Sequence, residues 1–128
     1  MPYFFSRILD LAFDAAIQRV TDELHKEGFG ILTDIDVKAT LKKKLDVDFR
    51  PYRILGACNP PYAYRALQAE DKIGTMLPCN VIVQEVAAGR CEVAAIDPIA
   101  SMQSVNNPAL SEVANQIQQK LREVINNL

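Results

Sequence analysis

The fold class of this 128-residue chain is decided by one stretch, Asn80-Val81-Ile82-Val83-Gln84-Glu85-Val86-Ala87-Ala88-Gly89-Arg90-Cys91-Glu92-Val93-Ala94-Ala95-Ile96. Residues 80–86 and 91–96 predict two strands, and residues 87–90 predict a tight hairpin in which Gly89 adopts a positive φ. Strands joined by such a short connection are antiparallel. The dipeptide Asp97-Pro98 then ends the sheet, because proline cannot donate a hydrogen bond to a continuing ladder.

Two long helices are predicted, one on each side of this hairpin in the sequence. Residues 11–27 carry apolar side chains at helical spacing. Asp10 is the predicted N-cap of this helix, and Gly28 is the left-handed residue that ends it. The helix over residues 107–128 begins with an Asn-Pro pair and has one apolar stripe along its whole length.

Three further strands are predicted over residues 3–9, 31–36 and 52–58. A short helix capped by Asp36 follows the second of them, and a helix begins after Asn59 behind the third. Neighbouring strands in pairs, rather than strict strand–helix alternation, favour an α+β fold. We therefore expect a single domain over residues 1–128 with the order β-α-β4-α. It has a largely antiparallel sheet, two long helices on one face, and short helical insertions between strands.

Composition narrows the class of protein. Hydrophobic residues make up 49% and charged residues 23% of the chain, which is typical of a globular protein. The net charge of −2 gives no basic field for nucleic acid. No apolar run approaches the ~20 residues of a membrane-spanning helix, and the N-terminus lacks the features of a targeting segment. Three widely spaced cysteines suit a reducing compartment, so we expect a soluble cytoplasmic protein without nucleic-acid or membrane partners.

The most suggestive feature for function is a repeated Cys-Asn dipeptide. Cys58-Asn59 ends one predicted strand, and Cys79-Asn80 begins the next. If these strand ends lie at the same edge of the sheet, both thiols face one pocket. Asn59 is also expected to cap the following helix by accepting the Tyr62 N–H.

Three interpretations of these cysteines stay open at this point. Free cysteines often behave as small buried hydrophobic residues. A second possibility is thiol redox chemistry or soft-metal binding by Cys58 and Cys79, and a third is that they line a ligand pocket. The helix that begins after Asn59 activates Cys58 only weakly, because neither Pro60 nor Pro61 offers an N–H to a thiolate.

Basic residues suggest an anionic ligand. Lys43 and Lys44 belong to a run of lysines on the short helix after Asp36, and Arg65 lies on the helix that begins after Asn59. A run of this kind is usually a solvated helix face. The more specific hypothesis is that these side chains direct an anionic group toward the Cys-Asn pocket.

Other candidate sites are weaker. A structural zinc ion needs four ligands at motif spacing, and one histidine (His25) with three cysteines does not supply them. Asp34 and Asp36 share a strand face and could act in acid–base chemistry, although Asp36 is expected to cap a helix. The sequence contains no nucleophile elbow, phosphate loop or dinucleotide fingerprint. No catalytic or metal-binding residue is therefore assigned, and no cofactor is implied.

Four segments of the chain resemble the signatures of a known family, and they occur in the expected order. They are Gly28-Phe29-Gly30-Ile31-Leu32-Thr33-Asp34-Ile35-Asp36-Val37 with Leu41-Lys42-Lys43-Lys44-Leu45, Tyr52-Arg53-Ile54-Leu55-Gly56-Ala57-Cys58-Asn59-Pro60 with Ala63-Tyr64-Arg65-Ala66-Leu67, Leu77-Pro78-Cys79-Asn80-Val81, and Ala95-Ile96-Asp97-Pro98. The chain resembles the bacterial and archaeal family of domain of unknown function number 302. The resemblance implies a TATA-binding-protein-like β-α-β4-α arrangement and a dimer, and it brings no established activity. Cys91 lies outside the pattern.

These observations lead to one main hypothesis. The protein is expected to be a homodimer that binds a small anionic ligand or ion in a pocket formed by Cys58, Asn59, Cys79 and Asn80. The apolar residues that support dimerisation, because they exceed what one small sheet covers, are Tyr3, Phe4, Phe5, Tyr62 and Met76. Thiol redox or soft-metal chemistry and a purely structural or interaction module are the alternatives.

Overall fold

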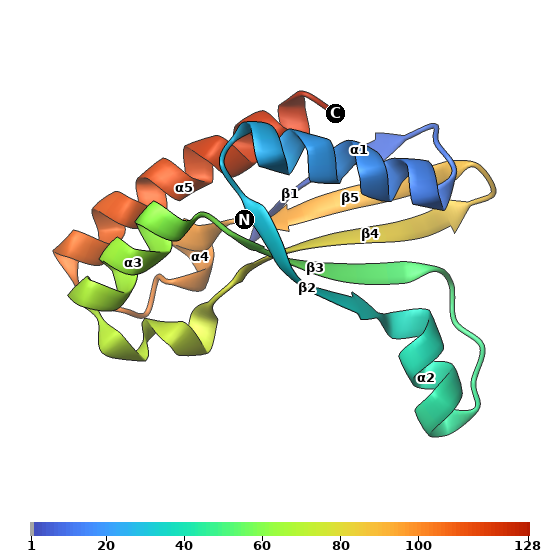
Figure 1. Ribbon diagram of the computed structural model, residues 1–128, viewed down its shortest axis with the longest axis horizontal. Helices are drawn as coiled ribbons and strands as arrows, with labels where there is room; N and C mark the ends of the chain where they lie inside the picture. Colours follow the sequence, from blue (N-terminus) through green and yellow to red (C-terminus); the bar gives the residue numbers. More distant parts are fainter. Residues whose placement is uncertain (1) are drawn as a thin grey trace.

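The computed structural model describes residues 2–128 and has an antiparallel sheet at its centre (Figure 1). Within these residues five strands lie in the order β1-β5-β4-β3-β2, and every neighbouring pair is antiparallel. The strands are β1 (Phe4–Leu9), β2 (Gly30–Asp36), β3 (Tyr52–Cys58), β4 (Cys79–Ala87) and β5 (Arg90–Ile96). The α+β class and the β-α-β4-α order predicted from the sequence are confirmed.

The β4–β5 hairpin forms the centre of the sheet. Val83 lies opposite Val93, and Gly89 adopts a φ of 72° in the connection, as predicted. Both valines are fully buried, because alternate residues of the two strands face the helices. The hairpin therefore supplies the middle of the hydrophobic core.

The two long helices, α1 (Phe13–Lys26) and α5 (Pro108–Asn126), lie on the same face of the sheet (Figure 1). The predicted stripe of α5 packs into the core, as shown by the buried Leu110, Val113, Ile117, Leu121, Val124 and Leu128. Asn107 caps α5 by accepting the Ala109 N–H at 3.1 Å. These contacts follow from apolar residues at 3.6-residue spacing, which face the sheet together.

The predicted cap of α1 is wrong. The residue before the helix is Ala12, whose methyl group cannot accept a hydrogen bond, and Asp10 lies two residues farther back. Asp10 instead pairs with Arg90 across the β1–β5 edge, with 3.3 Å between Oδ1 and Nε. Gly28 ends α1 as predicted, with a φ of 88° and its N–H donating to the His25 carbonyl.

Shorter helices connect the strands. They are α2 (Val37–Leu45), α3 (Pro60–Ala69), the 3-10 segment η1 (Asp71–Met76) and α4 (Pro98–Ser101). Helix α4 begins directly after the predicted end of the sheet, because the Asp97 carboxylate accepts the Ile99 N–H at 3.0 Å and starts a turn at Pro98.

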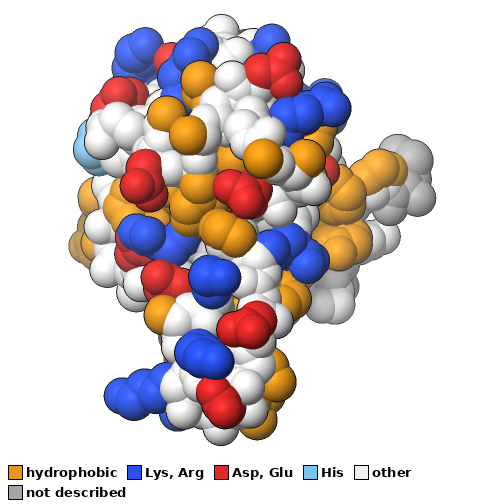
Figure 2. Space-filling view, turned by 90° about the vertical axis from the view of Figure 1, so that its right-hand side faces the viewer, with side chains coloured by type: hydrophobic (Ala, Val, Ile, Leu, Met, Phe, Trp, Pro, Cys, Tyr) orange, Lys and Arg blue, Asp and Glu red, His pale blue; other side chains and the backbone are white. Residues whose placement is uncertain are grey.

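Helix α2 extends away from the body of the molecule (Figure 1). All its residues are exposed or half-buried, and Asp36 caps it as predicted by accepting the Ala39 N–H at 2.9 Å. Figure 2 shows the end of the molecule that carries α2, where a narrow lobe at the bottom bears several Lys and Arg side chains. The lysine run thus lies on a projecting arm.

The second face of the sheet carries the alternate residues of each strand. Large apolar side chains remain exposed on it, including Phe4 at 37%, Ile8 at 42% and Ile35 at 47%. Among residues 2–128, no helix is both long enough and apolar enough to cross a lipid bilayer.

Candidate functional site

A cavity of about 280 Å³ lies beyond the ends of β3 and β4, between α3, η1 and α5. Small residues of α3, Ala63 and Ala66, form one wall, and Ala114 and Ile117 of α5 form another. Other parts of the wall are mainly apolar and come from Phe29, Leu32, Leu77, Pro78, Pro98 and Met102. Because the walls come from elements distant in the sequence, the cavity exists only in the folded chain.

The two strand ends bring Cys58 and Cys79 into the walls of this cavity. Cys79 pairs in the sheet with Ala57, the residue before Cys58. Burial raises the pKa of the Cys79 thiol to about 11, and a negative charge on Cys58 adds to this shift. At pH 7 burial therefore holds Cys79 as a thiol and not as the thiolate, the form that acts as a nucleophile.

Asn59 lies between the cavity and the end of α1. It is 7% exposed, and its Nδ2 donates to the Glu27 carbonyl at 3.0 Å. The expected cap of α3 by this side chain is wrong, since the Tyr62 N–H donates to the backbone carbonyl of Asn59 at 3.1 Å. Glu27 explains the difference: the last carbonyl groups of a helix lack partners within the helix, and Asn59 supplies one.

A close approach of β2 and Pro78 to the backbone of β3 at Gly56 fixes the position of the strand ends that carry Cys58 and Cys79. A Cβ on Gly56 would lie 2.1 Å from Thr33 Oγ1 and 2.7 Å from Pro78 Cγ. Thr33 belongs to β2, and Pro78 immediately precedes Cys79. Glycine is needed because any larger residue would push β2 and the start of β4 away from β3.

Comparison with known proteins places this architecture in a family. The model for "Domain of unknown function DUF302" matches residues 5–128. The chain belongs to the DUF302 family. A crystal structure of an uncharacterized conserved protein DUF302 from Bacillus stearothermophilus is similar, with 29% sequence identity, 98% of each chain covered and a TM-score of 0.89. No curated protein matches the chain.

The remaining predicted site residues lie elsewhere in this DUF302 fold. Asn80 is exposed on the outer face of the sheet, where it pairs with Gly56. Lys43 and Lys44 are on the projecting α2, outside the set of residues that line the cavity. Of the four residues predicted to form the pocket, Cys58, Asn59 and Cys79 line the cavity, whereas Asn80 does not. Asn80 directly follows Cys79 in β4, and adjacent residues of a strand face opposite sides of the sheet.

Arg65 lies on α3 at the rim, next to the cavity residue Tyr62. Its guanidinium carbon is 5.8 Å from the centre of the Tyr62 ring. Arg65 also donates to Gln116 Oε1 at 3.2 Å and lies 3.7 Å from a Glu112 carboxylate oxygen. It therefore faces α5 across the cavity edge.

Sequence reasoning missed most of the wall. Ala63, Ala66 and Leu67 lie on the apolar side of α3, and such a stripe usually packs against its neighbours without leaving space. The signal that could have found the cavity is the size of these side chains: two alanines of α3 and Ala114 of α5 are too small to fill the gap between the helices.

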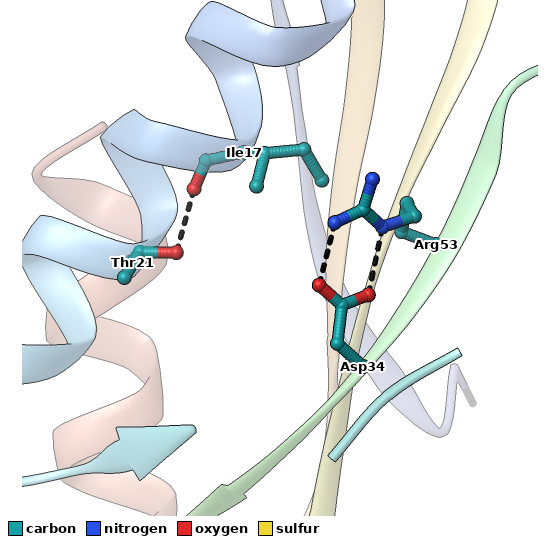
Figure 3. A network of polar contacts seen from close by, with 4 residues as sticks. All are labelled: Ile17, Thr21, Asp34 and Arg53. Carbon is teal, nitrogen blue, oxygen red and sulfur yellow. Dashed lines mark hydrogen bonds and ion pairs between the residues drawn. The ribbon is translucent and has the colours of Figure 1, made fainter. Parts of the chain in front are cut away.

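A separate polar pair lies on the helix-covered side of β2 and β3 (Figure 3). Arg53 donates to Asp34 through two bonds, Nε to Oδ1 at 2.7 Å and Nη2 to Oδ2 at 2.5 Å. This hydrogen-bonded guanidinium lowers the pKa of the Asp34 carboxyl below its usual value. In Figure 3 Ile17 of α1 lies beside the pair.

The arrangement does not suit acid–base catalysis by Asp34 and Asp36. Asp34 is held as an ion by Arg53, and Asp36 caps α2. Among the residues that the structure describes, no three His, Cys, Asp or Glu side chains cluster as metal ligands do. The cavity is therefore the best candidate for a functional site.

Proposed function

We propose that the protein binds a small, largely apolar molecule in the cavity between α3, η1 and α5. The observation that carries this proposal is the cavity itself, a space of about 280 Å³ whose walls are mostly apolar side chains. Ligand sites are concave, mostly apolar spaces with a few polar groups that orient the ligand, and their volumes begin near 300 Å³. At about 280 Å³ this cavity lies just below that lower bound, which favours a small ligand.

The polar groups at the wall are few. They are the thiols of Cys58 and Cys79, the amide of Asn59 and the hydroxyl of Tyr62. Neutral groups of this kind can orient a ligand by hydrogen bonds but cannot compensate the desolvation of a bare ion. The sequence led to the expectation of a small anionic ligand or an ion, and of these two we propose an organic ligand and not a bare ion.

The thiol redox alternative has weaker support. A reaction that cycles Cys58 and Cys79 needs a thiolate, and Cys79 is held as a thiol by burial. All three cysteines are free in the structure. Free thiols are in keeping with a reducing compartment such as the cytoplasm, where we propose that the protein acts.

A thermal-shift screen tests the binding proposal, with small aliphatic and aromatic compounds compared with sugars and inorganic ions. A ligand present at a hundred times its Kd adds about 2.7 kcal/mol to stability, which is a shift of several degrees. Ala63→Leu fills the cavity and should abolish the shift. Ala39→Leu makes the same change on the exposed side of α2 and should leave it intact.

Two results would contradict the proposal. One is the absence of any stabilisation of the wild-type protein, which would favour a structural or interaction module. The other is equal stabilisation of the wild-type and Ala63→Leu proteins, which would place the ligand elsewhere.

We also propose that the protein forms a homodimer through the outer face of the sheet. The supporting observation is the exposure of Phe4, Ile8 and Ile35 on that one face, next to the more exposed Tyr3. Phe5 and Tyr62, two of the residues expected to drive dimerisation, instead pack partly against the core. Light scattering of the wild type and of Ile8→Lys tests this, and a monomeric wild type at micromolar concentration would reject it.

A further inference from the structure

We infer that the molecule bound in the cavity is amphipathic and carries a single acidic group, which Lys120 and Arg65 hold beside Tyr62. This inference rests on the proposed function, because it names the class of ligand that the same cavity takes. The expected ligand is a small aliphatic or aromatic carboxylic acid, with its apolar part inside the cavity and its carboxylate at the rim.

The first observation is that Tyr62 borders two spaces. One is the apolar cavity, and the other is a polar groove of about 630 Å³ along α5. The groove wall includes Gln116, Gln119 and Lys120, and Gln116 directly precedes the cavity residue Ile117. A ligand that passes Tyr62 therefore meets an apolar environment at one end and a polar one at the other.

The second observation is that two cations lie close to the Tyr62 ring. The Lys120 Nζ atom and the Arg65 guanidinium carbon are each 5.8 Å from the ring centre. A cation within about 6 Å of an aromatic face is held there by the ring quadrupole. One positive group from α3 and one from α5 thus lie beside the ring of Tyr62, a residue that lines the cavity.

Both cations lie at long distances from their acidic partners. The Lys120 Nζ atom is 4.0 Å from Glu27 Oε1, and Arg65 Nη2 is 3.7 Å from Glu112 Oε1. Charge-assisted hydrogen bonds are much shorter, about 2.7–2.9 Å. A ligand carboxylate can therefore form closer bonds to these donors than the side chains now present.

The charge of the groove favours a monoanion. Glu27 and Glu123 line the groove together with Lys120 and Arg122, and Arg122 is also placed over the Phe5 ring at 4.8 Å. These acidic groups balance much of the positive charge and would repel a doubly charged phosphate more strongly than a carboxylate. With Arg65 and Glu112 included, three acidic side chains face three basic ones, so a ligand with one negative charge is repelled less than a ligand with two.

Octanoate and 1-octanol are suitable probes, because they share the same chain and differ in the charge of the head group. Calorimetric titration at pH 7 should show that the wild type binds octanoate more tightly than octanol. Lys120→Gln and Arg65→Gln should each lower the octanoate affinity about fivefold and leave octanol binding unchanged. Lys43→Gln removes the same charge on the distant α2 and serves as the control.

The outcomes separate the two proposals. Equal binding of octanol and octanoate, with no effect of Lys120→Gln or Arg65→Gln, would overturn the acidic head group while the apolar site stands. Failure of both probes to bind would overturn both proposals. Loss of octanol affinity in the rim variants would also contradict the inference, since it would show damage to the apolar cavity itself.

Discussion

The amide of Asn59 donates a hydrogen bond to the carbonyl of Glu27, which precedes it by 32 residues in the chain. This bond joins the end of α1 to the start of α3 at one wall of the cavity. A Cβ on Gly28, the residue after Glu27, would lie only 3.3 Å from Asn59 Nδ2. The sharp turn at Gly28 and the buried amide thus form one structural unit.

Replacing Asn59 by Asp should destabilise the fold by about 1–3 kcal/mol, because a buried donor is lost and two oxygens then face each other. Chemical denaturation of wild type and Asn59→Asp measures the change. Asn80→Asp is the control, since it makes the same substitution at an exposed position of the neighbouring dipeptide. Similar stability of Asn59→Asp and Asn80→Asp would show that the bond to Glu27 contributes little.

Gly56→Ala should be strongly destabilising, by about 1–3 kcal/mol, because the new methyl group overlaps Thr33 Oγ1 and the Pro78 ring. Gly30→Ala is the matched control on the adjacent strand. A Cβ at Gly30 meets no atom within 4 Å among residues 2–128. The denaturation midpoints of the two variants give the comparison. A Gly56→Ala protein as stable as Gly30→Ala would disprove the close approach of the three strands.

Asp34→Asn should reduce stability at pH 7 by at most about 1 kcal/mol, since the pair with Arg53 is partly exposed to solvent. The lowered pKa of Asp34 means that the folded state favours the ionised carboxyl. The contribution of the ionised Asp34 to the free energy of unfolding is therefore fully present above the ordinary carboxyl pKa of 3.8. It is lost as the pH falls through the lower pKa of the folded state.

Urea unfolding between pH 7 and pH 3 should show the Asp34→Asn difference shrinking toward the acid end. Asp48→Asn, which removes a far more exposed carboxylate on the α2 arm, should show little effect at either pH. A difference for Asp34→Asn that grew on acidification would have the wrong sign for this ion pair.

The three cysteines should react with iodoacetamide in a defined order at pH 7. Cys58 is half-buried and should be alkylated first, whereas Cys79 and Cys91 are buried. Cys79 should become reactive only as the pH approaches its raised pKa of about 11 or when the protein unfolds. Mass spectrometry of peptides over time measures the order. Rapid labelling of Cys79 at pH 7 would reopen the thiol redox hypothesis.

Local sequence patterns were sufficient for the main elements of the fold. The β4–β5 hairpin followed from Gly89 between two strand-forming runs, and α5 followed from its Asn-Pro start and apolar stripe. Predictions at helix ends were less successful. Asp10 lies two residues before the N-cap position of α1, and Asn59 donates to the distant Glu27 carbonyl. The partner of a capping side chain depends on what the folded chain places nearby.

The candidate site was harder to predict. The sequence pointed to Cys58, Asn59 and Cys79, which lie at strand ends where functional residues often occur. It also pointed to Asn80, Lys43 and Lys44, which the fold directs to other surfaces. The pattern of residue types contains no information about which strand ends share a cavity.

The amino-acid sequence alone determined the main strands and helices, their order and the antiparallel class of the sheet, because propensity, periodicity and turn chemistry act over a few neighbouring residues. The tertiary structure decided where empty space remains between α3 and α5, and which charges lie beside Tyr62. These properties depend on the packing of side chains from segments far apart in the chain. They arise only when the helices are placed against the sheet.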